Sequence, residues 1–146
     1  MWMLPYAYKK EKSPHYNDLM KVAKIATKAI KSIRQTNYTY GICRDLMYPA
    51  NGVGVDWAHE KMGIKYAYIL ELNPEYKFEG GYTQFLLPVH EIKPTLEETW
   101  AGILGMTEAI KNVEGMNSIA SKPYHSVPIL MSVILSGILA VINNDE

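Results

Sequence analysis

The sequence predicts an α/β domain. Two stretches, over residues 17–35 and from Pro94 onward, place apolar residues at helical spacing. Between them, residues 64–72 form an aromatic and apolar run without clean alternation, as in a strand that is buried on both faces. Helices that alternate with strands in this way favour helices packed on a sheet.

The first quarter of the chain predicts an extended entry and then a long helix. Residues 1–12 carry aromatic side chains and a short basic run. The helix is expected to be capped by Asn17 or Asp18 and to reach about Gln35. Lysines between its apolar positions predict a solvated face, and the apolar positions are Leu19, Val22, Ala23, Ala26, Ile30 and Ile33.

Shorter elements are expected in the middle of the chain. Residues 37–46 predict a turn and a short strand, and residues 48–54 form a loop rich in Asn and Gly. Asp56 is expected to cap one or two helical turns that end near Lys61. After the strand over residues 64–72, a loop is predicted over residues 73–83, and a short apolar segment follows it.

The last helix of the domain is expected to open at Pro94. Thr95 and Glu98 have the spacing of a capping box, in which each side chain bonds to the other residue's backbone amide. Its apolar face is predicted to hold Trp100, Ile103, Leu104 and Ile110. The composition changes near Gly115, so residues 1–114 are interpreted as one unit and residues 115–146 as a spacer and tail.

Composition excludes some functions. The formal net charge is zero and the basic residues are spread along the chain, which argues against a nucleic-acid partner. The single cysteine, Cys43, excludes an internal disulfide framework and a zinc site built from cysteines. It is interpreted as a small buried hydrophobe or as half of a bond to a segment outside this chain.

One carboxylate stands out in the predicted strand. Glu71 is surrounded in sequence by Tyr68, Ile69, Leu70 and Leu72. A carboxylate among apolar neighbours loses solvation, which makes it a candidate base.

Short motifs from Leu4 to Trp100 resemble the C-terminal third of the carboxypeptidase A-type zinc metallocarboxypeptidases, in the family's order and at nearly its spacing. They are Tyr40-Gly41, Tyr48-Pro49-Ala50, Asp56-Trp57-Ala58, Gly63-Ile64-Lys65-Tyr66, Glu71-Leu72, Phe85-Leu86-Leu87-Pro88 and Pro94-Thr95 with Glu98 and Trp100. The resemblance implies a mixed sheet flanked by helices, of which this chain forms a part. It also implies hydrolysis of C-terminal residues from peptides or proteins.

The resemblance assigns roles to six residues. Glu71 matches the family's proton-transferring glutamate, and Tyr48 matches the tyrosine that closes over the substrate. Val55 matches the floor of the pocket for the substrate's last side chain, which implies an apolar or aromatic preference. Ala50, Cys43 and Ile69 match positions in the pocket wall. Ordinary packing is an alternative interpretation of each of these apolar residues and of Cys43.

Several features depart from the family pattern. Val53 stands in the loop Gly52-Val53-Gly54 where the family has a second glycine, and Asn73 replaces the usual arginine after the Glu-Leu pair. The family binds zinc through a His-x-x-Glu motif and a distant histidine. The four histidines here, which lack that motif, are interpreted as surface or loop residues: His15, His59, His90 and His125. No zinc site is therefore expected in this chain alone.

The tail predicts a membrane-related segment. Val127 to Ile142 is apolar apart from two serines, and as a helix it would span about 24 Å, less than the ~30 Å of a bilayer core. Small residues before it predict a lipid-anchor signal with Asn117 or Ser118 as the attachment site. A short transmembrane tail and a helix that packs on a partner are the alternatives.

The leading hypothesis is part of an extracellular zinc metallocarboxypeptidase, secreted or membrane-anchored, that is inactive by itself. Residues 1–5 lack the features of a signal peptide, so the natural N-terminus is expected to lie outside this chain. The alternative is a non-enzymatic membrane-associated or interaction protein on a degenerate carboxypeptidase scaffold. A compact binding module is disfavoured, because part of a sheet leaves open strand edges.

Overall fold

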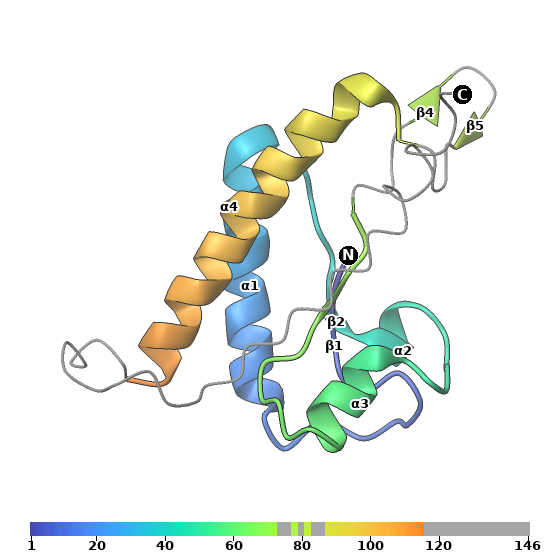
Figure 1. Cartoon of the computed structure of the whole chain (residues 1–146), viewed down its shortest axis with the longest axis vertical. Coiled ribbons are helices and arrows are strands. Elements are labelled where there is room, and N and C mark those ends of the chain that lie inside the picture. The colour runs from blue at the N-terminus through green and yellow to red at the C-terminus, as the bar shows by residue number, and fades with distance from the viewer. Residues whose placement is uncertain (73–76, 79–80, 83–86, 116–146) are drawn as a thin grey trace, which may run out of the picture.

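A computed structural model describes residues 1–72, 77–78, 81–82 and 87–115 (Figure 1). Residues 85 and 86 of the predicted short apolar segment over residues 85–88 lie outside these ranges, and the tail from residue 116 lies wholly outside them. In chain order the elements are β1 (Trp2–Leu4), α1 (Tyr16–Arg34), β2 (Tyr40–Ile42), α2 (Cys43–Leu46), α3 (Gly54–Glu60), β3 (Ile69–Leu70), β4 (Lys77–Phe78), β5 (Gly81–Tyr82) and α4 (Val89–Val113).

The first strand lies at the centre of a mixed sheet with the order β2-β1-β3. Strand β1 runs parallel to β2, with Trp2 opposite Tyr40, and antiparallel to β3, with Trp2 opposite Leu70. The α/β class and the mixed sheet that the resemblance implied are therefore confirmed. A separate antiparallel pair, β4 with β5, lies where only a loop was predicted.

Helices cover both faces of this sheet (Figure 1). Successive residues of a strand point to opposite faces, and Trp2 and Leu4 accordingly pack in one buried cluster while Met3 packs in another. The first cluster includes residues of α1 and α4, and the second includes residues of α2 and α3. We call the side of the sheet covered by α2 and α3 the α2–α3 face.

Glycines allow α4 to lie close to α1. A Cβ atom added at Gly102 would meet Ile30 Cγ1 at 2.7 Å and Trp2 Cζ3 at 3.2 Å. At Gly105 it would meet the Ala29 Cβ atom at 2.9 Å. Both approaches are closer than packed carbon atoms tolerate, so the two glycines set the distance between the helices.

Replacing Gly102 with Ala is expected to lower the free energy of unfolding by about 1–3 kcal/mol, because overpacking a tight contact forces neighbours to shift. Urea titration followed by circular dichroism measures the change. Gly54→Ala is the control, since an added Cβ at Gly54 meets nothing within 4 Å. Equal stability of the two variants would contradict the close helix contact.

Several predicted element ends are wrong. Helix α1 begins at Tyr16 after His15, so Asn17 and Asp18 lie inside its first turn and neither is the cap. Its end agrees with the prediction: Gln35 adopts a left-handed conformation and donates its N–H to the Lys31 carbonyl at 2.9 Å. The strand predicted up to Leu46 ends at Ile42, because Cys43 begins the helical turn α2.

The long strand predicted over residues 64–72 is also wrong in length, because only Ile69 and Leu70 form ladder pairs. Its burial was predicted correctly: residues 66–70 are all buried. Buried backbone groups that do not pair with another strand can make hydrogen bonds to nearby residues instead. The Ile64 N–H, for example, donates to the Ala58 carbonyl at 3.0 Å.

Helix α4 begins five residues before Pro94, at Val89, so Thr95 and Glu98 do not form a cap. Both are buried in the helix interface instead, and the Thr36 hydroxyl donates to the Glu98 carboxylate at 2.6 Å. The predicted apolar face is mostly wrong as well. Ile110 is buried, whereas Trp100 and Leu104 are largely exposed.

A charged cluster joins the C-terminal end of α4 to the rest of the domain. The Lys65 ammonium lies 2.6 Å from Asp18 Oδ2 and 2.7 Å from Glu114 Oε1. The Tyr66 hydroxyl donates to the same Glu114 oxygen at 2.6 Å. Hydrogen bonds from Lys65 and Tyr66 hold the pKa of Glu114 below its ordinary value, and burial raises the pKa of Tyr66 to about 12.

Because the folded-state pKa of Glu114 is lowered, its contribution to stability is present above its ordinary value of 4.5 and is lost as the pH falls through the folded-state pKa. Tyr66→Phe is expected to raise the pKa of Glu114 toward that ordinary value, which carboxyl-carbon NMR titration measures. An unchanged pKa of Glu114 in this variant would contradict the hydroxyl contact, and Tyr16→Phe serves as a control.

Candidate active-site wall

Three of the predicted pocket residues come together on the α2–α3 face. Cys43 begins α2, Val55 lies in α3 and Ile69 lies in β3, and all three belong to one buried cluster. Val55 is 1% exposed, so its side chain lies beneath the surface of this face. The cluster also contains Met3, Ala7, Ala58, Ile64 and Ala67.

Glu71 follows β3 directly at the edge of the sheet. Its backbone N–H donates to the Met1 carbonyl at 2.9 Å, which extends the contact between β1 and β3 by one residue. Its side chain is half-buried rather than enclosed in a long strand, as the sequence had suggested. Partial exposure leaves this carboxylate accessible to water, which a base in hydrolysis requires.

The negative charge of Glu71 also acts on Cys43. Burial raises the pKa of the Cys43 thiol, and the nearby negative charges of Asp56 and Glu71 raise it further. A thiol with a raised pKa carries little thiolate at neutral pH and is a poor nucleophile. Cys43 therefore fits a packing position in the wall.

Tyr48 and Ala50 lie on the loop between α2 and α3. The Tyr48 side chain is 64% exposed. The Ala50 N–H donates to the Ala7 carbonyl at 3.2 Å, which ties this loop to the segment after β1. Tyr48 is therefore exposed to solvent on a loop that is held in place at Ala50.

Asp56 is the residue whose importance the sequence reasoning missed. It does not cap α3, which begins two residues earlier, at Gly54. Its buried carboxylate accepts hydrogen bonds from the backbone N–H of Ala7 at 2.9 and 3.1 Å and from that of Tyr8 at 3.2 Å. Burial raises the pKa of Asp56, and these backbone bonds counteract the increase. The motif Asp56-Trp57-Ala58 was the available signal.

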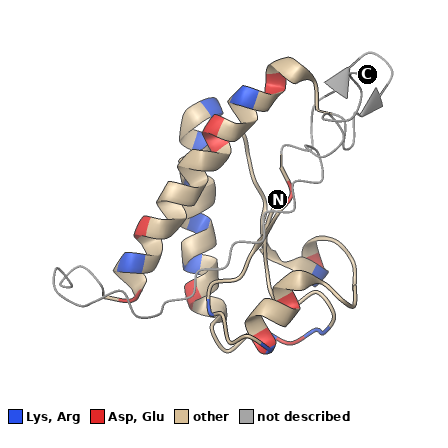
Figure 2. Cartoon of the chain, in the orientation of Figure 1, with Lys and Arg blue, Asp and Glu red and all other residues tan. Residues whose placement is uncertain are grey.

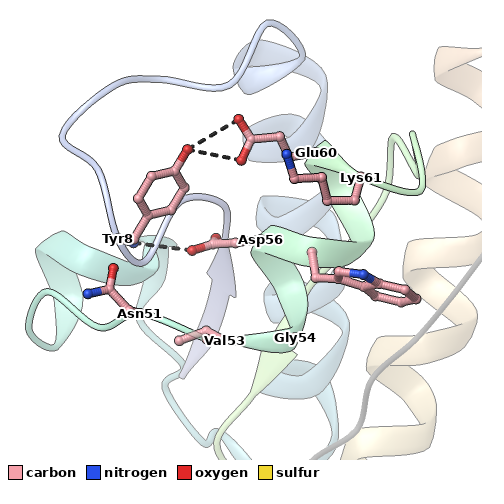
Figure 3. A pocket seen from close by; sticks show the side chains of 9 residues that line it. Tyr8, Asn51, Val53, Gly54, Asp56, Glu60 and Lys61 are labelled. Carbon is pink, nitrogen blue, oxygen red and sulfur yellow. Dashed lines mark hydrogen bonds between the residues drawn. The ribbon is translucent and has the colours of Figure 1, made fainter.

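A hollow of about 420 Å³ lies beside Asp56 on the outer side of α3 (Figure 3). At this hollow the Tyr8 hydroxyl donates a hydrogen bond to Glu60 Oε2 at 2.9 Å, and Lys9 forms an ion pair with Glu60 at 3.2 Å. None of the six predicted site residues lines this hollow, whose lining residues are Tyr8, Asn51, Gly52, Val53, Gly54, Asp56, Trp57, Glu60 and Lys61.

His59 is buried in α3, which corrects its interpretation as a surface or loop residue. Its Nδ1 atom lies 2.8 Å from the Ile64 carbonyl oxygen, and its Nε2 atom lies 2.6 Å from Ser13 Oγ. A carbonyl only accepts hydrogen bonds, so Nδ1 donates to Ile64, and Nε2 shares a hydrogen bond with the Ser13 hydroxyl. His59 thus fastens α3 to the segment before α1.

No three His, Cys, Asp or Glu side chains gather into a possible metal site within residues 1–72 and 87–115. The side chains described there do not fit a zinc ion. Of the four histidines, His125 lies outside the described residues.

Comparison with known proteins decides the family. The family model described as zinc carboxypeptidase matches residues 1–102. The chain belongs to the zinc carboxypeptidase family. This result confirms the resemblance found in the sequence motifs, and the zinc that the family uses is the cofactor that resemblance implied.

Individual relatives of this family agree. Mouse (Mus musculus) carboxypeptidase A4 is 41% identical over 110 residues, which cover 75% of this chain and 25% of the relative. Carboxypeptidase A1 from Bos taurus is 38% identical over the same length and coverage. The chain thus spans about a quarter of the length of these curated relatives.

Solved structures show the same carboxypeptidase fold. Bovine thrombin-activatable fibrinolysis inhibitor, in complex with tick carboxypeptidase inhibitor, superposes with a TM-score of 0.67 at 31% identity. The match covers 76% of this chain and 36% of that one. A further structure of thrombin-activatable fibrinolysis inhibitor gives a TM-score of 0.65 at 30% identity.

Proposed function

We propose that this chain forms one wall of the active site of a zinc carboxypeptidase that releases C-terminal residues from peptides. The observation that carries the proposal is the position of Glu71. Its half-buried carboxylate ends β3 beside the cluster that holds Cys43, Val55 and Ile69. A base at this place takes a proton from the attacking water and returns it to the leaving amine.

An apolar or aromatic C-terminal residue is the preferred substrate in this proposal. Val55, Cys43 and Ile69 form a wall without a charged side chain, and a buried charge on the substrate would find no partner among them. Ala50 borders the same wall through its bond to Ala7. The exposed Tyr48 ring closes over the bound residue.

By itself the chain is inactive in this proposal. Hydrolysis in this family needs zinc, and the side chains of residues 1–72 and 87–115 do not fit the metal. The zinc ligands and the group that holds the substrate carboxylate therefore come from polypeptide outside these ranges.

A chimera tests the proposal. Residues 1–114 replace the matching segment of Bos taurus carboxypeptidase A1, and release of phenylalanine from a peptide that ends in Phe is measured with zinc present. We expect activity from the chimera and none from the 146-residue chain. A folded chimera without activity would contradict the catalytic-wall assignment, and zinc-dependent activity of the chain alone would contradict the proposed inactivity.

We further propose an extracellular location, as the family resemblance implies. No helix among residues 1–72 and 87–115 combines the length and apolar character needed to cross a bilayer. Whether the protein is released or held at a membrane depends on the segment Val127–Ile142. Attachment at Asn117 or Ser118 would favour the membrane-associated alternative, and mass spectrometry of the C-terminal peptide from cells tests it.

A further inference from the structure

Helix α4 carries a second apolar face that nothing in the described part of the chain covers. Its buried face packs against α1 and the sheet through Thr99, Gly102, Met106 and Ile110, among others. Leu96, Trp100 and Leu104 recur every four residues on another side of the helix, and they are 46%, 59% and 53% exposed. Residues spaced in this way form one continuous stripe.

Trp100 and Leu104 of this stripe lie on an uncharged stretch of the helix. No charged residue occurs from Thr99 to Thr107, and Figure 2 shows the charges of α4 gathered toward its two ends. Lys93 precedes the stripe and Glu97 lies beside Leu96 near its N-terminal end, while Glu108 and Lys111 follow it at the C-terminal end. An apolar centre with a charged rim is the usual anatomy of a surface that binds another polypeptide.

We propose that the occupant of this stripe is the chain's own apolar segment, residues 127–142. This segment contains no charged residue and follows α4 in the same chain. Residues 114–126 link the two and can span up to ~43 Å, whereas Leu104 lies only about 14 Å from the end of α4. A short tether of this kind gives the segment a local concentration in the millimolar range.

The proposed docking is antiparallel to α4, because the tether leaves from the C-terminal end of the helix and this direction needs the shorter path. In this arrangement Leu130 would face Leu104 and Leu139 would face Leu96. Asp145 and Glu146 then arrive at the end of α4 where Lys93 lies. The Lys93 side chain is 88% exposed and its ion pair with Glu97 is long, at 3.8 Å, so its ammonium is accessible to these carboxylates.

Disulfide trapping in the full chain tests this docking. In a Cys43→Ser background, Leu104→Cys is combined with Leu130→Cys, and Leu96→Cys with Leu139→Cys, and the protein is oxidised at low concentration. Both pairs are expected to close within one molecule. The control pair combines Lys28→Cys, on the exposed side of α1, with Leu130→Cys, and it is expected to stay open.

Trp100 gives a second readout. In a Trp57→Phe background the other tryptophan, Trp2, is fully buried, so acrylamide quenching reports Trp100. Deleting residues 127–142 is expected to increase the quenching. Disulfide-linked dimers would show that a second copy of the chain occupies the stripe. Binding to phosphatidylcholine vesicles, with neither cysteine pair forming a disulfide, would show that residues 127–142 insert into membranes. Either result, or open pairs in a folded chain, would overturn the proposal.

Discussion

Replacing Glu71 with Gln is expected to lower kcat for release of a C-terminal phenylalanine by about 10²–10⁴-fold in the chimera, because an amide cannot accept the proton of the attacking water. The KM is expected to change little, since the role proposed for Glu71 is in the proton transfer and not in holding the peptide. Steady-state kinetics on a peptide that ends in Phe measure both constants.

The matched control is Glu108→Gln, which removes an exposed carboxylate from α4, far along the chain from β3. This variant should keep the kcat of the parent. Because Glu71 is half-buried and its backbone N–H supplies the contact to Met1, the Gln variant should unfold at the same urea concentration as the parent. An equal loss of kcat in both variants would argue against a catalytic role of Glu71.

Asp56→Ala is expected to destabilise the full chain by about 3 kcal/mol, because buried N–H groups that lose a charged acceptor keep their desolvation cost. The groups concerned are the backbone amides of Ala7 and Tyr8, whose bonds to this carboxylate are the tie between α3 and the segment after β1. Urea unfolding of the variant measures the loss.

Asp45→Ala provides the comparison, since Asp45 is exposed on α2. The pH gives a second readout. Burial raises the folded-state pKa of Asp56 above its ordinary value of 3.8, so its ionisation lowers stability as the pH rises from that value through the folded-state pKa. Asp56→Asn should lack this decrease. Equal stability of the Asp56→Ala and Asp45→Ala variants would show that the hydrogen bonds from Ala7 and Tyr8 to Asp56 do not stabilise the fold.

The sequence predicted the elements that have a strong internal signal. The apolar spacing from Leu19 to Ile30 located α1, and the buried run around Tyr68 located the strand that leads to Glu71. Cap assignments failed at Asp18, Asp56 and Thr95. An Asp or Thr at a helix start has the same local pattern whether its side chain bonds the helix or a distant segment. For Asp56 the distant partner, Ala7, is 49 residues away in sequence.

The candidate site was predictable only where family motifs marked it. Composition and spacing alone gave Glu71 as a carboxylate among apolar residues, whereas the grouping of Cys43, Val55 and Ile69 depends on how α2, α3 and β3 stack on the sheet. The exposed face of α4 was mistaken for its buried face because Trp100 and Leu104 are apolar. The contact with α1 instead uses Gly102 and other small or polar residues, which hydropathy does not mark.

The central position of β1 has a consequence for the order in which the protein is made. The ribosome releases this strand before either of its neighbours, since β2 follows more than thirty residues later and β3 more than sixty. Until then Trp2 and Leu4 lack the two strands that pair with β1 here, and contacts that distant in sequence close slowly. A nascent chain must therefore keep this apolar strand protected, and Glu71 reaches its place only when β3 emerges.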